Sequence, residues 1–205
     1  MLHALLVSLA SAATPAAPPP SLDAVVQSVE HRYADVASLR ATFVQTARSM
    51  YGEDRQTGTL YLERPNHMRW EFDGDHKLFL ADGTVMWIST PEEHQVLKTP
   101  QVEGAGGADV LLASLAHLSE RFEASLLDDP GVTHLSLVPR EKDAAFTKVE
   151  VVLGPELVLQ RLVLTDTVGT VTDLAFSEVR LGDKLDPKLF QFVVPAGHTV
   201  VDMGG

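Results

Sequence analysis

Short strand-like segments follow one another in this sequence with only turn residues between them, and this pattern is the strongest constraint on the fold. Five such segments fill residues 57–98, and glycine, proline, asparagine or aspartate marks each connection. Connections this short join antiparallel neighbours, because a parallel pair needs a crossover of about a dozen residues or more. The expected strands are residues 57–63, 67–72, 77–81, 84–89 and 94–98. The sequence therefore predicts an antiparallel sheet and disfavours a doubly wound fold.

The rest of the chain adds strands and two helices to this sheet. An apolar stripe from Leu22 to Tyr33, after the possible N-cap Ser21, predicts a first helix, and alternation from Leu39 to Thr46 predicts a strand. A second helix is expected at residues 108–118, after the flexible sequence EGAGG. The remaining expected elements are strands at 133–138, 146–153, 157–164, 171–179 and 191–194, and a helical turn at 186–190. The total is about ten or eleven strands in a single domain.

Several of the predicted strands are apolar on both faces. Met86 and Ile88, for example, alternate with Trp87 rather than with polar residues. A sheet with one face in water shows a clean alternation, so this sheet is either covered on both faces or curled around an apolar interior. Two helices give little cover, which favours a curled sheet with a hydrophobic lumen. A partly closed barrel filled by its own side chains is the alternative.

Strand parity indicates which side chains face such a lumen. Met68, Trp70 and Phe72 fall on one face of one predicted strand. We expect this face to look into the cavity; the alternative is an outer face that packs on the first helix.

The N-terminus reads as an export signal. Residues 1–13, MLHALLVSLASAA, combine a short apolar run with a small-residue cleavage pattern, which predicts a signal peptide. Residues 14–20, TPAAPPP, predict a stiff extended leader. The folded domain is then expected to span residues 21–205.

Composition and motifs disfavour several function classes. Lys and Arg number 16 against 28 Asp and Glu, and a net charge of -12 is repelled by phosphate backbones, so no nucleic-acid partner is expected. The absence of cysteine removes thiolate zinc sites, iron–sulfur clusters and thiol nucleophiles. None of the 8 histidines pairs at metal-ligand spacing, and neither a GxSxG nor a phosphate-binding glycine motif is present. We therefore expect no metal, no cofactor and no enzymatic activity.

Three motifs together resemble one known family. Residues 58–70 read GTLYLERPNHMRW, residues 81–87 read ADGTVMW, and residues 91–96 read PEEHQV. Upstream, LRATFVQ at residues 39–45 looks like the family's first strand, and FQFVVPAGHTV at residues 190–200 looks like its closing strand. Through these motifs the chain resembles LolA, the periplasmic outer-membrane lipoprotein carrier family. The similarity extends from about residue 22 to residue 202.

The resemblance implies a fold, a function and partners. The fold is a mainly β structure, an incomplete antiparallel β-barrel of about 10–11 strands with helices forming a lid over an apolar cavity. The function is a periplasmic carrier of acylated lipoproteins, loaded by an inner-membrane ABC transporter and unloaded by an outer-membrane acceptor, and we expect it to be a monomer. The arginine that matches Arg64 is implied to hold backbone carbonyls of a lid helix and so to gate the cavity. The alternative functions are a carrier of another periplasmic lipid or glycolipid on the same fold, and an exported enzyme or a sensor of mislocalised lipoprotein.

A lumen lined by methionine, tryptophan, phenylalanine and leucine suits acyl chains, which gain about 0.8 kcal/mol per buried CH₂. The residues expected to contact lipid are Phe43, Leu60, Leu62, Met68, Trp70, Phe72, Trp87, Leu111, Leu112 and Leu115.

Overall fold

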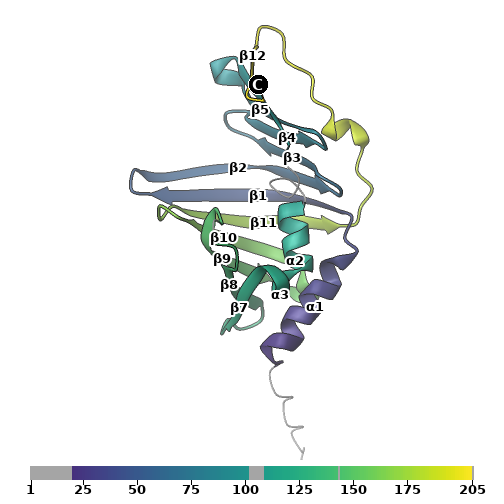
Figure 1. Cartoon of the computed structure of the whole chain (residues 1–205), viewed down its shortest axis with the longest axis vertical. Helices are drawn as coiled ribbons and strands as arrows, with labels where there is room; N and C mark the ends of the chain where they lie inside the picture. Colours follow the sequence, from purple (N-terminus) through teal and green to yellow (C-terminus); the bar gives the residue numbers. More distant parts are fainter. Residues whose placement is uncertain (1–19, 102–108, 143, 205) are drawn as a thin grey trace, which may run out of the picture.

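The computed structural model describes residues 20–101, 109–142 and 144–204, and in them twelve strands form one sheet (Figure 1). Its order is β12-β6-β5-β4-β3-β2-β1-β11-β10-β9-β8-β7. Neighbours are antiparallel except β12, which runs parallel to β6. The strands are β1 (Ser38–Ser49), β2 (Gly52–Glu63), β3 (His67–Phe72), β4 (Leu78–Asp82), β5 (Val85–Thr90), β6 (Gln95–Pro100), β7 (Phe122–Leu127), β8 (Thr133–Pro139), β9 (Phe146–Leu153), β10 (Leu159–Asp166), β11 (Val171–Leu181) and β12 (Thr199–Asp202).

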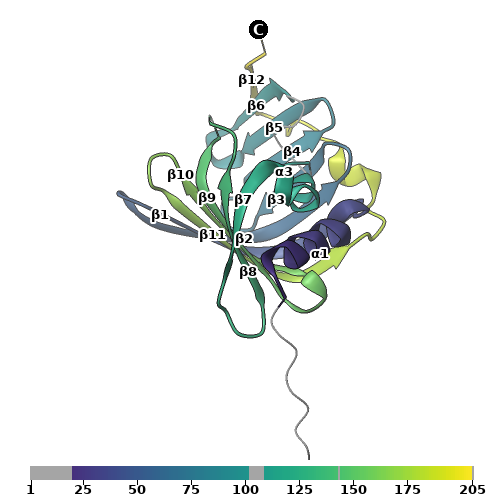
Figure 2. The ribbon, with the colours of Figure 1, turned by 60° about the horizontal axis from the view of Figure 1, so that its bottom comes forward.

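The sheet is curved but does not close. Strands β7 and β12 stand at its two ends and do not pair with each other, and the helices lie within the curve (Figure 2). The predicted fold class, a mainly β incomplete barrel with helices, is confirmed.

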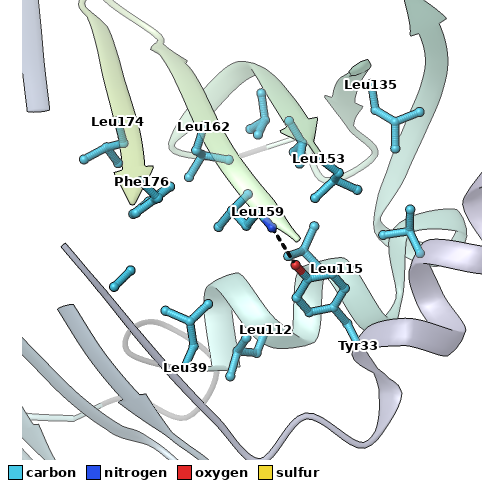
Figure 3. Close-up of a cluster of buried hydrophobic side chains, with 14 of the residues drawn as sticks. Tyr33, Leu39, Leu112, Leu115, Leu135, Leu153, Leu159, Leu162, Leu174 and Phe176 are labelled. Atoms are coloured by element: carbon cyan, nitrogen blue, oxygen red, sulfur yellow. Dashed lines mark hydrogen bonds between the residues drawn. The ribbon is translucent and has the colours of Figure 1, made fainter. Parts of the chain in front are cut away.

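Helix α1 (Leu22–Ala34) is the predicted first helix. The Ser21 side chain accepts a hydrogen bond from the Ala24 N–H at 3.3 Å, which caps the helix start. Its apolar stripe is buried in the same core cluster as β1 and β2. At its C-terminal end the Tyr33 hydroxyl donates to the Leu157 carbonyl at 3.0 Å. It also accepts from the Leu159 N–H at 3.1 Å, which fixes α1 to the start of β10 (Figure 3). Burial raises the pKa of Tyr33 to about 12, against the smaller opposing effects of the Leu159 hydrogen bond and the Arg32 charge.

The second predicted helix is broken into short pieces. A π-helical turn, η2 (Asp109–Ala113), leads into α2 (Ser114–Ala116) and α3 (Leu118–Arg121). Leu112, Leu115 and Leu118 are nonetheless buried at the spacing that the sequence indicated. The EGAGG sequence, the predicted signal peptide and all but the last residue of the predicted leader lie outside the described residues. No helix in the described part of the chain is both long enough and apolar enough to cross a bilayer.

The C-terminal segment differs most from the prediction. The helical turn η4 (Pro187–Phe190) is confirmed, but residues 191–194, expected as a strand, pair with no strand. Residues 182–198, called the strap below, lie against β3 and β5, and the chain re-enters the sheet only at β12. Arg69 on β3 donates to the Leu189 carbonyl at 2.9 Å, and the Phe192 ring stacks on Trp87 of β5 at 5.0 Å between centroids.

Candidate functional site: an apolar cavity under the helices

The concave face of the sheet and the short helices enclose a cavity of about 1170 Å³. One wall comes from β2 to β5, the opposite wall from β8 to β11, and η2, α2 and α3 close one side. The apolar lining residues are Leu60, Leu62, Met68, Trp70, Phe72, Phe79, Met86, Ile88, Leu111, Leu115, Leu118, Phe122, Leu137, Phe146, Val149, Val151, Leu162, Leu164, Leu174 and Phe176. The lumen is thus not filled by the protein's own side chains.

Seven of the ten residues that the sequence analysis assigned to lipid line this cavity. They are Leu60, Leu62, Met68, Trp70, Phe72, Leu111 and Leu115. The structure places Met68, Trp70 and Phe72 on one face, as strand parity requires, and that face looks into the cavity.

Phe43 and Leu112 support the lining without being part of it. Phe43 is 2% exposed, and its ring packs edge-on against both Trp70 and Phe72, with 5.3 Å between centroids in each pair. Leu112 is fully buried in the core cluster between the helices and the sheet. Phe43 therefore supports two lining side chains from behind.

Trp87 is the residue that the structure places elsewhere. On β5 it alternates with Met86 and Ile88, and these two face the cavity, so Trp87 points to the outer face of the sheet. There its indole N–H donates to the Asp82 carboxylate at 3.0 Å and its ring stacks on Phe192. The expected place of Trp87 in the lumen is corrected: Met86 and Ile88 take it. Alternation along β5 sets Trp87 apart from Met86 and Ile88, but the choice of face depends on the β3–β4 and β4–β5 registers, for which the sequence has no local signal.

Aromatic rings on β3 and β4 contact one another in the lining. Trp70 and Phe72 lie nearly parallel, with 6.3 Å between centroids and 8° between planes, and Phe79 meets Phe72 edge-on at 5.7 Å. Such edge-to-face and offset contacts stabilise ring clusters beyond their buried area. The result is a packed aromatic wall on β3 and β4.

Charged and amide groups line the cavity as well, at the end where the β1–β2 hairpin and the start of β7 lie. Three acids and three bases contribute, so this part of the lining has little net charge: Asp54, Glu120, Glu141, Lys77, Arg121 and Arg140. Lys77 is held at 2.8 Å from Asp75, and this hydrogen bond raises the pKa of the Lys77 ammonium. A cavity with an apolar body and a polar end suits an amphipathic ligand whose polar part stays in water.

Arg64 lies outside the cavity, in the turn between β2 and β3. Its Nη1 donates to the carbonyl of Ala34, the last residue of α1, at 2.9 Å, while its backbone N–H donates to the Ala37 carbonyl at 2.8 Å. Its Nε and Nη2 are buried and have no hydrogen-bond partner among the described residues. Ala34 has one of the C-terminal carbonyls that a helix leaves without an internal partner, so Arg64 links the turn to the end of α1.

Metal-ligating groups are not brought together anywhere in residues 20–101, 109–142 and 144–204: no cluster of three His, Cys, Asp or Glu side chains could hold an ion.

Comparison with known proteins gives a consistent result. Residues 34–193 match the family described as outer membrane lipoprotein carrier protein LolA. A curated relative from Methylobacillus flagellatus, named outer-membrane lipoprotein carrier protein, is 29% identical over 182 residues, covering 86% of this chain and 88% of its own. A relative of the same name from Methylibium petroleiphilum is 30% identical over 172 residues, covering 82% and 84%. Among solved structures, an uncharacterized conserved protein from Thermus thermophilus is similar in fold, with a TM-score of 0.53 and 17% identity over 87% of this chain and 96% of that one.

Proposed function

Because this chain belongs to the LolA family of outer-membrane lipoprotein carrier proteins, we propose that it carries lipoproteins through the periplasm with their acyl chains in the cavity under the helices. The observation that carries the proposal is the cavity itself: about 1170 Å³, lined mainly by leucine, methionine and aromatic side chains. The lipid contacts are assigned to Leu60, Leu62, Met68, Trp70, Phe72, Leu111 and Leu115, with Phe43 and Leu112 behind them. The protein acts by binding, without catalysis.

Release limits how deeply the chains can be inserted. At about 0.8 kcal/mol per CH₂, two or three fully buried long chains gain roughly 25 to 40 kcal/mol. That exceeds the ceiling of about 18 to 21 kcal/mol for non-covalent complexes. A carrier therefore inserts the chains partly, or opens a closed state at a cost that offsets much of the gain.

Arg64 contributes to the free energy needed to open the closed state. Its bond to the Ala34 carbonyl joins α1 to the β2–β3 turn, and α1 packs on the pieces α2 and α3 that carry cavity residues. We assign Arg64 to the closed, empty state: the bond holds the helices over the sheet and breaks when acyl chains enter. Two guanidinium nitrogens without a partner among the described residues give this arginine further donors for the loaded arrangement.

The partners follow from this cycle. An inner-membrane ABC transporter supplies the energy for loading, and an outer-membrane acceptor receives the cargo because it binds the chains more strongly. The carrier is proposed to work as a monomer.

Transfer between membranes tests the proposal. Inner-membrane vesicles that hold the transporter and a radiolabelled acylated lipoprotein are given ATP with and without this protein. Label is expected in the supernatant, bound to the protein, only when the protein is present, and it is then expected to move to outer-membrane vesicles. The same polypeptide without acyl chains is the control and should not bind. Label that stays in the vesicles contradicts the proposal.

A further inference from the structure

A second pocket lies on the outer face of the sheet, away from the apolar cavity. It has a volume of about 540 Å³ and is enclosed by the ends of β2, β3 and β4 on one side and by the strap on the other. Its lining residues are Glu63, His67, Asp82, Thr84, Pro187, Phe190, Gln191 and Phe192. The residues on the cavity side of the same strands do not contribute to it.

Three polar side chains form a row across the floor of this pocket. Glu63 on β2 stands opposite His67 on β3, and His67 stands opposite Asp82 on β4. Residues directly opposite in an antiparallel sheet share a face, with about 4.5–5.5 Å between Cβ atoms. Two carboxylates therefore flank one imidazole.

The two carboxylates differ in how they are held. Asp82 accepts hydrogen bonds from the Thr84 and Val85 N–H groups and from the Trp87 indole, at 2.8 to 3.0 Å. Burial alone raises the pKa of Asp82, but these bonds outweigh it and leave the pKa below its usual value, so Asp82 stays ionised. The Glu63 side chain forms no hydrogen bond or ion pair with another described residue. Arg69, on the same face of β3, is engaged by Glu71 and the Leu189 carbonyl and does not neutralise the row.

Aromatic rings and an unpartnered nitrogen complete the site. The Phe190 ring lies 5.2 Å from the His67 ring, and Phe192 stacks on Trp87. His67 Nδ1 is buried and has no hydrogen-bond partner among the described residues. Carboxylates beside aromatic faces bind a planar cation with several donors, and the arginine guanidinium fits this description better than a compact ammonium.

We propose that this pocket binds the guanidinium group of an arginine side chain presented by a partner protein, with the Glu63 carboxylate as the main acceptor. The exposed residues Thr84, Pro187 and Gln191 surround the pocket, so a side chain can enter from solvent. The net charge of -12 favours approach of a basic partner over an acidic one. The site is independent of the cargo cavity, because the two lie on opposite faces of the sheet.

Two tryptophans make the test specific. Trp87 stacks on Phe192 at the pocket, whereas Trp70 lines the cargo cavity, so their indole N–H signals in a ¹H–¹⁵N NMR spectrum report the two sites separately. The probe is the peptide acetyl-Gly-Arg-Gly-amide, titrated into the full chain. The expected result is a saturable shift of the Trp87 signal with a Kd of about 1 mM and an unshifted Trp70 signal.

Control peptides and variants decide the outcome. The citrulline peptide, which has the same shape without the charge, is expected not to bind, and free argininamide is expected to bind more weakly than the peptide.

Glu63→Gln is expected to weaken peptide binding about tenfold, whereas Glu123→Gln, an acid on β7, should leave it unchanged. An unshifted Trp87 signal, equal binding of the citrulline peptide, or an unchanged Kd in Glu63→Gln overturns the proposal. Free argininamide binding as tightly as the peptide overturns the assignment to a protein partner. Glu63→Gln should still load acylated lipoprotein. The outcome of the peptide titration is therefore independent of the proposed carrier function.

Discussion

Alternate residues of β3 serve two different surfaces. Met68, Trp70 and Phe72 face the cargo cavity, while His67 and Arg69 face the strap and the outer pocket. The period of two in a strand makes this division automatic, because successive side chains point to opposite faces. A substitution on β3 therefore affects one surface or the other according to its parity.

Met68→Glu is expected to impair cargo loading. It places a carboxylate without a partner on the cavity wall, and an unpaired buried polar group costs about 1–3 kcal/mol in proteins, so the apparent affinity for acylated lipoprotein should fall about tenfold or more. Loading from labelled vesicles measures this. The matched control is Tyr61→Glu on β2, because the Tyr61 side chain lies on the outer face, its ring 5.7 Å from the Arg40 guanidinium, and this variant should load normally. Normal loading by a folded Met68→Glu protein contradicts the assignment of this face.

Arg64→Leu is expected to bind cargo more tightly and deliver it poorly. Loss of the bond to Ala34 destabilises the closed, empty state by about 1 to 3 kcal/mol, the range for a hydrogen bond to a charged group. That energy no longer opposes loading, so affinity should rise by about one to two decades and transfer to acceptor membranes should slow. Arg64→Lys should restore transfer only in part, because lysine lacks the planar fork. Equal transfer by wild type and Arg64→Leu leaves Arg64 as a residue of the turn without a gating role.

At this scale, parity explains both what the sequence predicts and what it does not. Alternation along β3 is enough to place Met68, Trp70 and Phe72 together. The same rule carried across the β3, β4 and β5 registers puts Met86 and Ile88 on the cavity side and Trp87 outside, but those registers depend on two turns whose pairing becomes known only in the fold. Both faces of β5 are apolar in the sequence, so apolar character alone does not show which face lies in the cavity. Trp87 can lie on the outer face because Phe192, from a distant part of the chain, covers it there.

At the scale of elements, α1 depends on one tyrosine for its attachment to β10. Tyr33→Phe leaves the Leu157 carbonyl and the Leu159 N–H without their partner and should lower the free energy of unfolding by about 1–3 kcal/mol at neutral pH. Chemical denaturation measures the difference.

The pH dependence of this difference follows from the pKa of Tyr33, which burial raises from the usual tyrosine value of 10.0 to about 12 in the folded protein. A folded-state pKa above the unfolded value gives stability that is complete below pH 10 and is lost as the pH rises toward 12. The advantage of wild type over Tyr33→Phe should therefore shrink between these values, by roughly 2–3 kcal/mol at about 1.36 kcal/mol per pKa unit. A difference that stays constant through this range contradicts the assignment of a buried, neutral phenol.

Gly58 on β2 allows a close approach that no other residue permits. A Cβ there would lie 1.8 Å from the Glu71 carbonyl oxygen of β3 and 2.8 Å from the Phe43 ring. Gly58→Ala should therefore lower the free energy of unfolding by about 2 kcal/mol or more, because β3 or Phe43 must move. Gly74→Ala, where a Cβ meets nothing within 4 Å, is the control and should change it by less than about 0.5 kcal/mol. Chemical denaturation measures both values. Equal losses in the free energy of unfolding for the two variants contradict this packing.

The elements that the sequence predicts are those with strong local signals. The α1 stripe with its Ser21 cap, and the hairpins predicted between residues 57 and 98, are of this kind. Strand β7 escapes prediction because Phe122–Leu127 follows a helical segment directly, with no turn residue to mark its start. Strand β12 pairs parallel to β6 after a long strap, and a contact between residues about a hundred positions apart leaves no local pattern.

For the whole molecule, the open sheet accounts for a cavity rather than a packed core. Twelve strands curve without closing, and the short helices cover the concave face instead of filling it. The apolar strand faces predict the curled sheet. The size of the lumen follows only from the positions of the broken helix η2, α2 and α3, which sequence periodicity does not specify.

The central claim is that acyl chains of a polypeptide cargo occupy this cavity. Native mass spectrometry of the protein, purified from the periplasm without detergent, tests it most directly. The account predicts a complex whose added mass is that of a triacylated polypeptide, and the loss of this complex in Met68→Glu. Free lipid or glycolipid as the only bound species, or an empty protein that hydrolyses an ester substrate, would contradict it.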